Sequence, residues 1–379
     1  RIPDPGSAVS FNGTFTDPGS DTHTIDWDFG DGTEASGTLT PVHTYAGNGQ
    51  YTVTLTVTDD DGGTGTDTLT VTVLNVAPAA DAGADQTADE GSTVRFAGTF
   101  SDPGNDSHTI LWDFGDGAAA EGSLTPEHVY ADNGTYPVTL TVTDDDGGVG
   151  TAALTVTVLN AAPTAAAGQD QITDEGTAIT FAGTFTDPGS DTHTILWDFG
   201  DGLTSEGSLT PEHTYADNGS YTVTLTVTDD DGGVGSDTLT VTVNNVLPTV
   251  QPGPDQTADE GAGVRFAGTF TDPGSDSHTI LWDFGDGAQA SDTLAPVHTY
   301  ADSGVYTVTL TVTDDDNGVG RNTMTVTVIN VAPTAWAGQD QTADEGSVVR
   351  FAGTFSDPGN DSHTILWDFG DGAAAEGSL

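Results

Sequence analysis

Apolar and polar residues alternate along much of this chain with a period of two. Threonine fills most of the polar positions. Because successive side chains of a strand point to opposite faces of a sheet, this pattern predicts β-strands with one buried face and one threonine-rich face. No segment shows the periodicity of a helix. Between residues 94 and 158 the apolar positions form four sets: Val94, Phe96 and Phe100; Ile110, Trp112 and Phe114; Tyr136, Val138, Leu140 and Val142; and Leu154, Val156 and Val158.

The same unit is repeated along the chain. A tryptophan in the string Trp-Asp-Phe-Gly-Asp-Gly returns every 85 residues without insertion or deletion, at Trp27, Trp112, Trp197, Trp282 and Trp367. Asp-Gly, Pro-Gly and Asn-Gly pairs separate the apolar sets, as turns require. Six to eight short strands in about 85 residues favour a small β-sandwich, so the fold class is all-β with tandem sandwiches. A continuous β-helix is disfavoured, because each copy carries its own aromatic centre.

Short proline-containing segments mark the joints between the copies. Proline fixes one backbone angle and no Gly/Ser tract is present, so stiff joints are expected. The joints are Leu74–Pro78, Leu159–Pro163, Asn244–Pro248 and Ile329–Pro333. The predicted repeats are 1–75, 76–160, 161–245, 246–330 and 331–379, of which the first lacks its opening residues and the last is partial. Because both ends fall inside a repeat, we expect the chain to be a window on a longer repetitive protein.

The charge of the chain is extreme. There are 59 acidic and five basic residues, a formal net charge of −54, and all five basic residues are arginine. Nucleic acids and anionic membrane surfaces both need a basic face, so both are excluded as partners. Self-repulsion opposes a compact state unless salt screens it or cations bind. The composition therefore predicts either a high-salt environment or one that contains calcium.

Other features of the composition bear on the chemistry and the location of the protein. Cysteine is absent, which excludes disulfides and thiol chemistry. No apolar run is long enough for a transmembrane helix, and no signal peptide is visible. The lack of lysine makes a poor substrate for trypsin-like proteases. We expect an extracellular or cell-surface location.

Four strings within each copy resemble the polycystic-kidney-disease (PKD) repeat. In the second copy they are Phe96–Pro103, Trp112–Gly117, Pro126–Tyr130 and Tyr136–Asp144. The resemblance covers essentially the whole chain and implies an immunoglobulin-like β-sandwich. Members of the family occur outside cells in surface-layer proteins, adhesins, collagenases, chitinases and proteases, mostly as spacer or binding modules. The resemblance thus implies fold and location more firmly than activity.

The resemblance also implies a structural calcium site near each joint. Collagenase modules of the family bind calcium with a joint asparagine and with aspartates after the second strand. The matching positions are Asn75 with Asp102 and Asp106, Asn160 with Asp187 and Asp191, Asn245 with Asp272 and Asp276, and Asn330 with Asp357 and Asp361. The loop here lacks one carboxylate of the usual Asp-Pro-Asp-Gly-Asp string. The alternative is a turn capped by Asp and Asn side chains.

Two further features carry weaker hypotheses. The acidic triplets that begin at Asp59, Asp144, Asp229 and Asp314 are interpreted as solvated hairpin tips rather than cation sites, since they lack EF-hand spacing. Paired histidines, such as His108 with His128, suggest a zinc or pH site, but a histidine that opens a strand is more often a hydrogen-bonding residue of the core or of an edge. The carboxylate pairs recur in turns and not in a cleft, so we predict no enzyme.

The favoured function is structural: a fibre, stalk or surface appendage built from sandwiches, stiffened by calcium and self-associating into filaments. Open sheet edges and threonine ladders would mediate that association. The alternatives are an adhesin array that binds a surface polysaccharide or protein, and the spacer of a secreted hydrolase. A binding face should carry repeated exposed aromatics, and only Trp336 departs from the period in that way.

Overall fold

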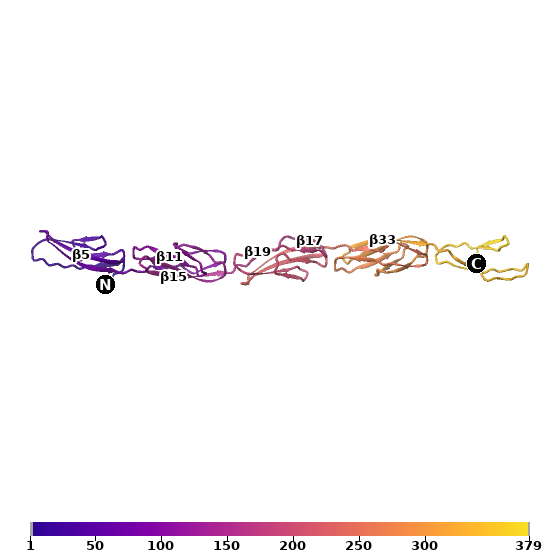
Figure 1. Cartoon of the computed structure of the whole chain (residues 1–379), viewed down its shortest axis with the longest axis horizontal. Helices are drawn as coiled ribbons and strands as arrows, with labels where there is room; N and C mark the ends of the chain where they lie inside the picture. The colour runs from indigo at the N-terminus through magenta and orange to yellow at the C-terminus, as the bar shows by residue number, and fades with distance from the viewer. Residues whose placement is uncertain (1–2, 378–379) are drawn as a thin grey trace. The chain divides into compact units, whose positions relative to one another are not determined.

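The computed structural model describes residues 3–377, and its regular structure there is all β-strand (Figure 1). The all-β prediction is therefore confirmed. Within these residues there is no helix long and apolar enough to cross a membrane. The structure divides into two compact units. One runs to residue 165 and includes 185–194 and 226–235; the other holds 166–184, 195–225 and the residues from 236 onward.

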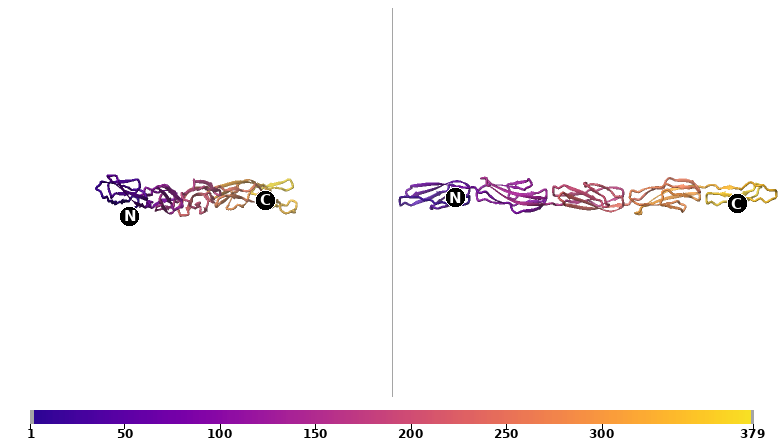
Figure 2. Two further views of the ribbon diagram at one scale, coloured as in Figure 1. Left: turned by 60° about the vertical axis from the view of Figure 1, so that its left-hand side comes forward. Right: turned by 90° about the horizontal axis from the view of Figure 1, so that it is seen from below.

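The second repeat shows the complete folding unit. Its main sheet has the order β12-β11-β14-β15-β8, in which only β8 runs parallel to its neighbour. Two short pairs, β7 with β10 and β9 with β13, complete the sandwich. In the right-hand view of Figure 2 the second repeat, coloured purple to magenta, is a bundle of extended segments. The strands are β7 (Ala79–Asp81), β8 (Gln86–Asp89), β9 (Thr93–Arg95), β10 (Thr99–Ser101), β11 (His108–Asp113), β12 (Ala119–Glu121), β13 (Glu127–Val129), β14 (Gly134–Asp144) and β15 (Val149–Leu159).

The other repeats place strands at corresponding positions. The first repeat has β1 (Ala8–Ser10), β2 (His23–Asp28), β3 (Glu34–Ser36), β4 (Val42–Thr44), β5 (Gly49–Asp59) and β6 (Thr64–Val73). The third has β16 (Thr164–Ala166), β17 (Gln171–Asp174), β18 (Ala178–Thr180), β19 (Thr184–Thr186), β20 (His193–Asp198), β21 (Thr204–Glu206), β22 (Glu212–Thr214), β23 (Gly219–Asp229) and β24 (Val234–Asn244). The fourth has β25 (Thr249–Gln251), β26 (Gln256–Asp259), β27 (Gly263–Arg265), β28 (Thr269–Thr271), β29 (Thr279–Asp283), β30 (Gln289–Ser291), β31 (Val297–Thr299), β32 (Gly304–Thr313) and β33 (Val319–Ile329). The fifth has β34 (Thr334–Trp336), β35 (Thr354–Ser356), β36 (Leu366–Asp368) and β37 (Ala374–Glu376).

The first, second and fourth repeats each close a core of their own around an indole ring. In the second repeat the predicted inward positions of β14 and β15 are buried except for the partly buried Tyr136, and Trp112 is fully buried among them. The fourth repeat has the equivalent core around Trp282, and the first around Trp27. In the fifth repeat, whose described residues include no counterparts of β32 and β33, Trp367 is only partly buried.

One predicted strand is broken in the structure. Val94, Phe96 and Phe100 read as a single alternating set, but β9 and β10 belong to different sheets, and the chain between them is not a strand. The break lies at Gly98, where a Cβ atom would come within 2.7 Å of both the Trp112 ring and Leu140. The backbone thus passes directly against the indole ring, and only glycine permits that approach.

A column of rings supports one side of this core. His128 stacks on Phe114 with ring centroids 4.2 Å apart, and its edge meets Tyr130. The buried Tyr130 hydroxyl donates to the Phe114 carbonyl at 3.0 Å. His128 Nε2 lies 2.6 Å from Asp116 Oδ2, which fixes the imidazole ring in the stack. This histidine is therefore a hydrogen-bonded part of the core.

Replacing Tyr130 with Phe tests the buried hydroxyl. Removing the donor leaves the Phe114 carbonyl without its partner, which costs about 1–3 kcal/mol. Tyr136→Phe is the matched control, because that hydroxyl bonds the Asp132 carbonyl at the exposed edge. Hydrogen-exchange mass spectrometry of second-repeat peptides in the full chain should show faster exchange for Tyr130→Phe alone. Equal effects of the two variants would contradict the assignment.

Asp116 should give this repeat an acid-sensitive contribution. Burial raises the pKa of Asp116, but bonds from the Ala118 N–H and from His128 outweigh it, so the pKa lies below the ordinary 3.8. Asp116→Asn should cost about 1–2 kcal/mol at neutral pH, less than the full worth of such bonds because the site is partly exposed. A depressed folded pKa means that the contribution is complete above 3.8 and is lost as the pH falls through the folded value. Unfolding curves of wild type and variant should therefore converge in acid, and a constant gap would refute the assignment.

Candidate cation-binding clusters at the joints

The loop after β10 is built to present two carboxylates. Asp102 Oδ1 accepts from the Gly104 N–H at 3.1 Å, which closes an Asp-Pro-Gly turn, and its Oδ2 lies 2.8 Å from His108 Nε2. The capped turn that the sequence offered as the alternative is thus present. It directs Asp102 and Asp106 toward the same place.

A third carboxylate comes from the β14–β15 hairpin. Asp144 is buried, and its Oδ1 accepts from the Gly148 N–H at 2.7 Å. Asn75 donates from Nδ2 to Asp144 Oδ2 at 3.0 Å, and this bond with others holds the pKa of Asp144 below its ordinary value. Carboxylate oxygens of Asp102, Asp106 and Asp144 all lie within 4.8 Å of one another. We call this group, with Asn75, the first joint cluster.

At the other joints the predicted asparagine also contacts an aspartate, although not always one of those predicted beside it. At the second joint Asn160 donates to Asp229, the counterpart of Asp144, at 3.1 Å. At the third joint Asn245 donates to Asp314, also at 3.1 Å. At the fourth joint the amide orientation that satisfies both partners lets Asn330 donate to Asp361 Oδ2 at 2.9 Å and to Glu260 Oε1 at 3.2 Å.

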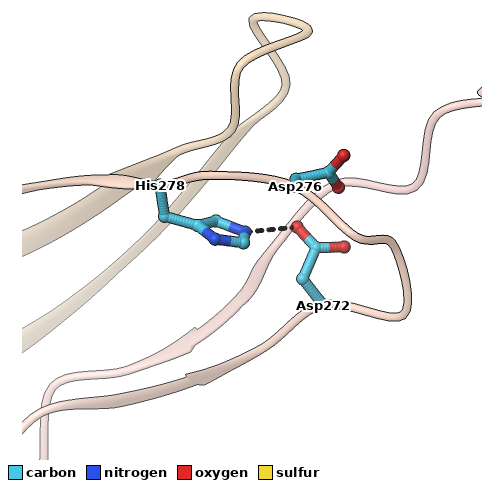
Figure 3. A group of neighbouring side chains, drawn as sticks. All are labelled: Asp272, Asp276 and His278. Carbon is cyan, nitrogen blue, oxygen red and sulfur yellow. Dashed lines mark hydrogen bonds and ion pairs between the residues drawn. The ribbon is translucent and has the colours of Figure 1, made fainter. Parts of the chain in front are cut away.

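Figure 3 shows the loop of the third joint. His278 points at Asp272 and lies 2.9 Å from its Oδ2, and the Asp276 carboxylate lies beside the same loop. One possible ligand atom from each of these three residues lies within 4.8 Å of the other two. The bond from His278 leaves Asp272 Oδ1 buried and without a partner.

The sequence reasoning missed a buried glutamate at three of the joints. Glu90, Glu175 and Glu260 are each at most 2 % exposed. Oxygens of Glu90, Asp187 and Asp191 lie within 4.8 Å of one another. The available signal was a glutamate repeated every 85 residues in the string Asp-Glu-Gly, before an apolar strand. The string does not show what this glutamate contacts, because that depends on where the next repeat places its own loop.

Many oxygens of these clusters accept no hydrogen bond. Among the described residues, the buried side-chain oxygens without a partner are all in the joint clusters: Asn75 Oδ1, Glu90 Oε2, Asn160 Oδ1, Glu175 Oε2, Asp191 Oδ2, Asn245 Oδ1, Glu260 Oε2, Asp272 Oδ1 and Asp276 Oδ2. Each such group is costly, because the hydrogen bonds that it made to water are not replaced. The clusters are therefore incomplete without a further positive or proton-donating group.

Several carboxylates of these clusters have raised pKa values, which reflect the same cost of burial. Burial, followed by the charges of Glu90 and Asp187, raises the pKa of Asp191 to about 6. Burial and neighbouring aspartates likewise raise the pKa of Asp106 and of Asp276, and burial raises that of Glu175. Carboxylates with raised pKa values are in surroundings that disfavour their negative charge.

Two of the weaker sequence hypotheses are decided here. The view of the acidic triplets as solvated tips is wrong for Asp144, Asp229 and Asp314, which are buried because the hairpin backbone wraps around them. The paired histidines do not share a site, since His108 bonds Asp102 and His128 bonds Asp116. Trp336 faces outward as expected, with 55 % of its surface exposed.

Comparisons with known proteins agree with this architecture. The PKD domain profile matches residues 1–73, 75–158, 160–243, 245–328 and 330–379. A microbial collagenase of Vibrio alginolyticus is 39% identical over 97 residues, covering 24% of this chain and 12% of that protein. The pre-pro-metalloprotease PrtV of Vibrio cholerae serotype O1 is 37% identical over 99 residues, covering 26% of this chain and 10% of that protein. The chain thus spans about a tenth of the length of these relatives.

Solved structures with several sandwiches in series are also similar. A tetra-tandem repeat from the extending region of a large adhesion protein has a TM-score of 0.41 at 15% identity, covering 87% of this chain and 93% of that one. Titin domains I67–I69 have a TM-score of 0.29 at 15% identity, covering 66% and 98%. At these TM-scores the likeness adds no argument about function. The family matches follow one another along nearly the whole sequence, and the chain belongs to the PKD domain family as a tandem array of such domains.

Proposed function

We propose that this chain is a structural array outside the cell, in which calcium stabilises the joints between consecutive PKD domains. The observation that carries the proposal is the set of buried oxygens without partners, which recurs where one domain meets the next. The extracellular location is supported by the family to which the chain belongs.

The residues present fit calcium. This ion takes six to eight oxygen ligands from carboxylates, amide carbonyls and water at about 2.3–2.6 Å. At the third joint, Asn245, Asp272, Asp276 and Glu175 each offer a buried oxygen that has no other partner. The chain has no lysine that would serve as an internal counter-ion. Asn75, Asn160, Asn245 and Asn330, with the aspartates predicted beside them, would hold the ion.

Calcium would also relieve the charge problem of the fold. Burial, and after it the like charges of neighbouring carboxylates, raises the pKa of Asp191 and of Asp276, so each cluster opposes folding when it is fully ionised. An ion that binds the folded state alone stabilises that state by mass action. High salt would screen such repulsion only in part, because buried charges are screened less than exposed ones.

A structural role suits the repetition better than a catalytic one. The chain consists of one module copied along its length, and the acidic residues cluster at every joint rather than in one cleft. Self-association into filaments would use the edge strands of the five-stranded sheets, such as β12, whose outer backbone groups have no strand beside them in that sheet. A surface polysaccharide or protein is the alternative partner, and the exposed Trp336 is the aromatic that would contact it.

The relatives favour a second candidate. Both are proteases by name, a collagenase and a metalloprotease, and the present chain matches only a small part of each. An array of this kind could therefore space a hydrolase from its substrate or from the cell surface. Electron microscopy of the native material separates the two, since filaments support the structural array and dispersed molecules that carry a separate catalytic domain support the spacer.

Calcium removal tests the proposal directly. At low salt, EDTA should lower the melting temperature of the full chain by about 10–20 °C. A ligand at 100 times its Kd contributes about 2.7 kcal/mol, and each kcal/mol shifts the midpoint by about 4–8 °C in a domain of this size. Calorimetry with EDTA, and then with calcium restored, measures the shift. Identical curves in EDTA and in calcium would remove calcium from the account.

A further inference from the structure

The glutamates stand apart from the other cluster members by their origin. At the second joint, Asn160, Asp187, Asp191 and Asp229 all belong to the domain matched at 160–243. Glu90 belongs to the preceding domain, matched at 75–158. A cation held by the aspartates alone would sit inside one domain, whereas Glu90 brings a carboxylate from the other side of the joint.

Each glutamate is held by its own domain and by the joint. The Glu90 N–H donates to the Leu159 carbonyl at 3.0 Å, and Glu90 Oε1 accepts from the Ala161 N–H at 2.7 Å. Its second oxygen, Oε2, is buried without a partner. The same three features recur at Glu175, with the Asn244 carbonyl and the Val246 N–H, and at Glu260, with the Ile329 carbonyl and the Val331 N–H.

Glycines on both sides allow the glutamate to reach the next loop. A Cβ at Gly189 would lie 2.9 Å from the Glu90 carboxyl carbon, and one at Gly91 would lie 2.7 Å from Pro188. Gly91 also has a positive φ of 67°, which turns the chain directly after the glutamate. An N–H bond from Ser190 to the Ala131 carbonyl, at 2.8 Å, joins the two domains beside it.

We infer that Glu90, Glu175 and Glu260 are inter-domain ligands that turn a cation site within one domain into a bridge between two. The carboxyl group of each glutamate lies against the loop of the next domain, beside Gly189, Gly274 and Gly359 in turn, and the preceding domain contributes it. This inference rests on the proposed binding of calcium. It assigns the glutamates a role that the family-derived ligand set does not contain.

The first joint is a natural comparison. Pro5 occupies the position of Glu90, and Gly6 keeps the same turn, with a φ of 72° and an N–H bond to the Tyr45 carbonyl at 2.9 Å. The approach to the next loop is looser, since a Cβ at Gly6 would lie 3.5 Å from the Pro103 carbonyl oxygen. The first joint cluster therefore has its aspartates without a carboxylate from the preceding domain. Calcium there would bind within the second domain and leave the first joint unbridged.

Calcium titration of the full chain tests the ligand. Glu175→Gln is isosteric and keeps the acceptor for the Val246 N–H. It should weaken calcium binding at one site by at least about tenfold, the scale at which even an indirect partner of a metal ligand acts. Glu206→Gln is the matched control, because it removes the same charge from an exposed position on β21 of the same repeat. Isothermal titration with calcium chloride measures both variants.

A second readout separates a ligand from a merely structural residue. Without calcium, Glu175→Gln should melt at or above the wild-type temperature, because it removes a carboxylate whose pKa burial raises. Adding calcium should raise the melting temperature of Glu175→Gln by less than it raises that of the wild type. The reverse variant, Pro5→Glu, should tighten calcium binding at the first joint.

Distance measurements test the bridge itself. The chain has no cysteine, so two introduced cysteines can be labelled specifically. Thr210 with Ala295 spans the third joint, and Thr40 with Thr125 spans the first; all four are exposed. Calcium should narrow the spin-label distance distribution for the pair across the third joint and leave that of the first joint unchanged, unless Pro5→Glu is also present.

The outcomes are distinct. Suppose that the wild type, Glu175→Gln and Glu206→Gln bind calcium equally, and that calcium does not narrow the distance distribution across the third joint. The bridging role is then wrong, while the proposed calcium sites stand. If the wild type binds no calcium, both proposals fall. Weaker calcium binding in Glu175→Gln but not in Glu206→Gln, together with tighter binding in Pro5→Glu, supports the bridge.

Discussion

A buried oxygen that accepts no hydrogen bond is costly, and this chain places such oxygens wherever two domains meet. The cost cannot be met from within the composition, which has no lysine and five arginines against 59 acidic residues. The raised pKa of Asp191, caused first by burial, reflects this cost. A bound cation would offset this cost while the carboxylates stay ionised. The need for a cation connects the composition, the joints and the proposed function.

The fold delivers these oxygens with little freedom. Asp144 is fixed by the hairpin between the two longest strands, Asp102 by a capped turn, and Glu90 by the parallel pairing that brings the end of β8 to the end of β15. These elements are far apart in sequence, and a backbone N–H holds each of the three carboxylates in place. A site built on such elements is arranged before any ligand arrives, so little ordering entropy opposes binding.

The domains differ at their joints although their cores are alike. The core residues follow the repeat closely, and the indole rings of the four repeats that include their long hairpin strands are buried in the same manner. The joints vary instead: Pro5 stands where later repeats have glutamate, and Trp336 stands exposed where the others have small or polar residues. Variation at the joints changes how neighbouring domains are connected while each sandwich keeps its own stability, as expected for repeats that interact only with their neighbours.

The sequence by itself determined the class of fold, the repeat and most of the core, because strand alternation and a recurring tryptophan are local and periodic signals. It also pointed to Asp102 and Asp106, through the family resemblance. It did not reveal the break at Gly98, the burial of Asp144 or the role of Glu90. Those depend on which segments meet in space: the indole ring excludes a Cβ at Gly98, the hairpin encloses Asp144, and the turn of one domain carries Glu90 into the loop of the next. Only the tertiary structure decides which segments come into contact. No local pattern encodes the distance between residues as far apart in sequence as Glu90 and Asp191.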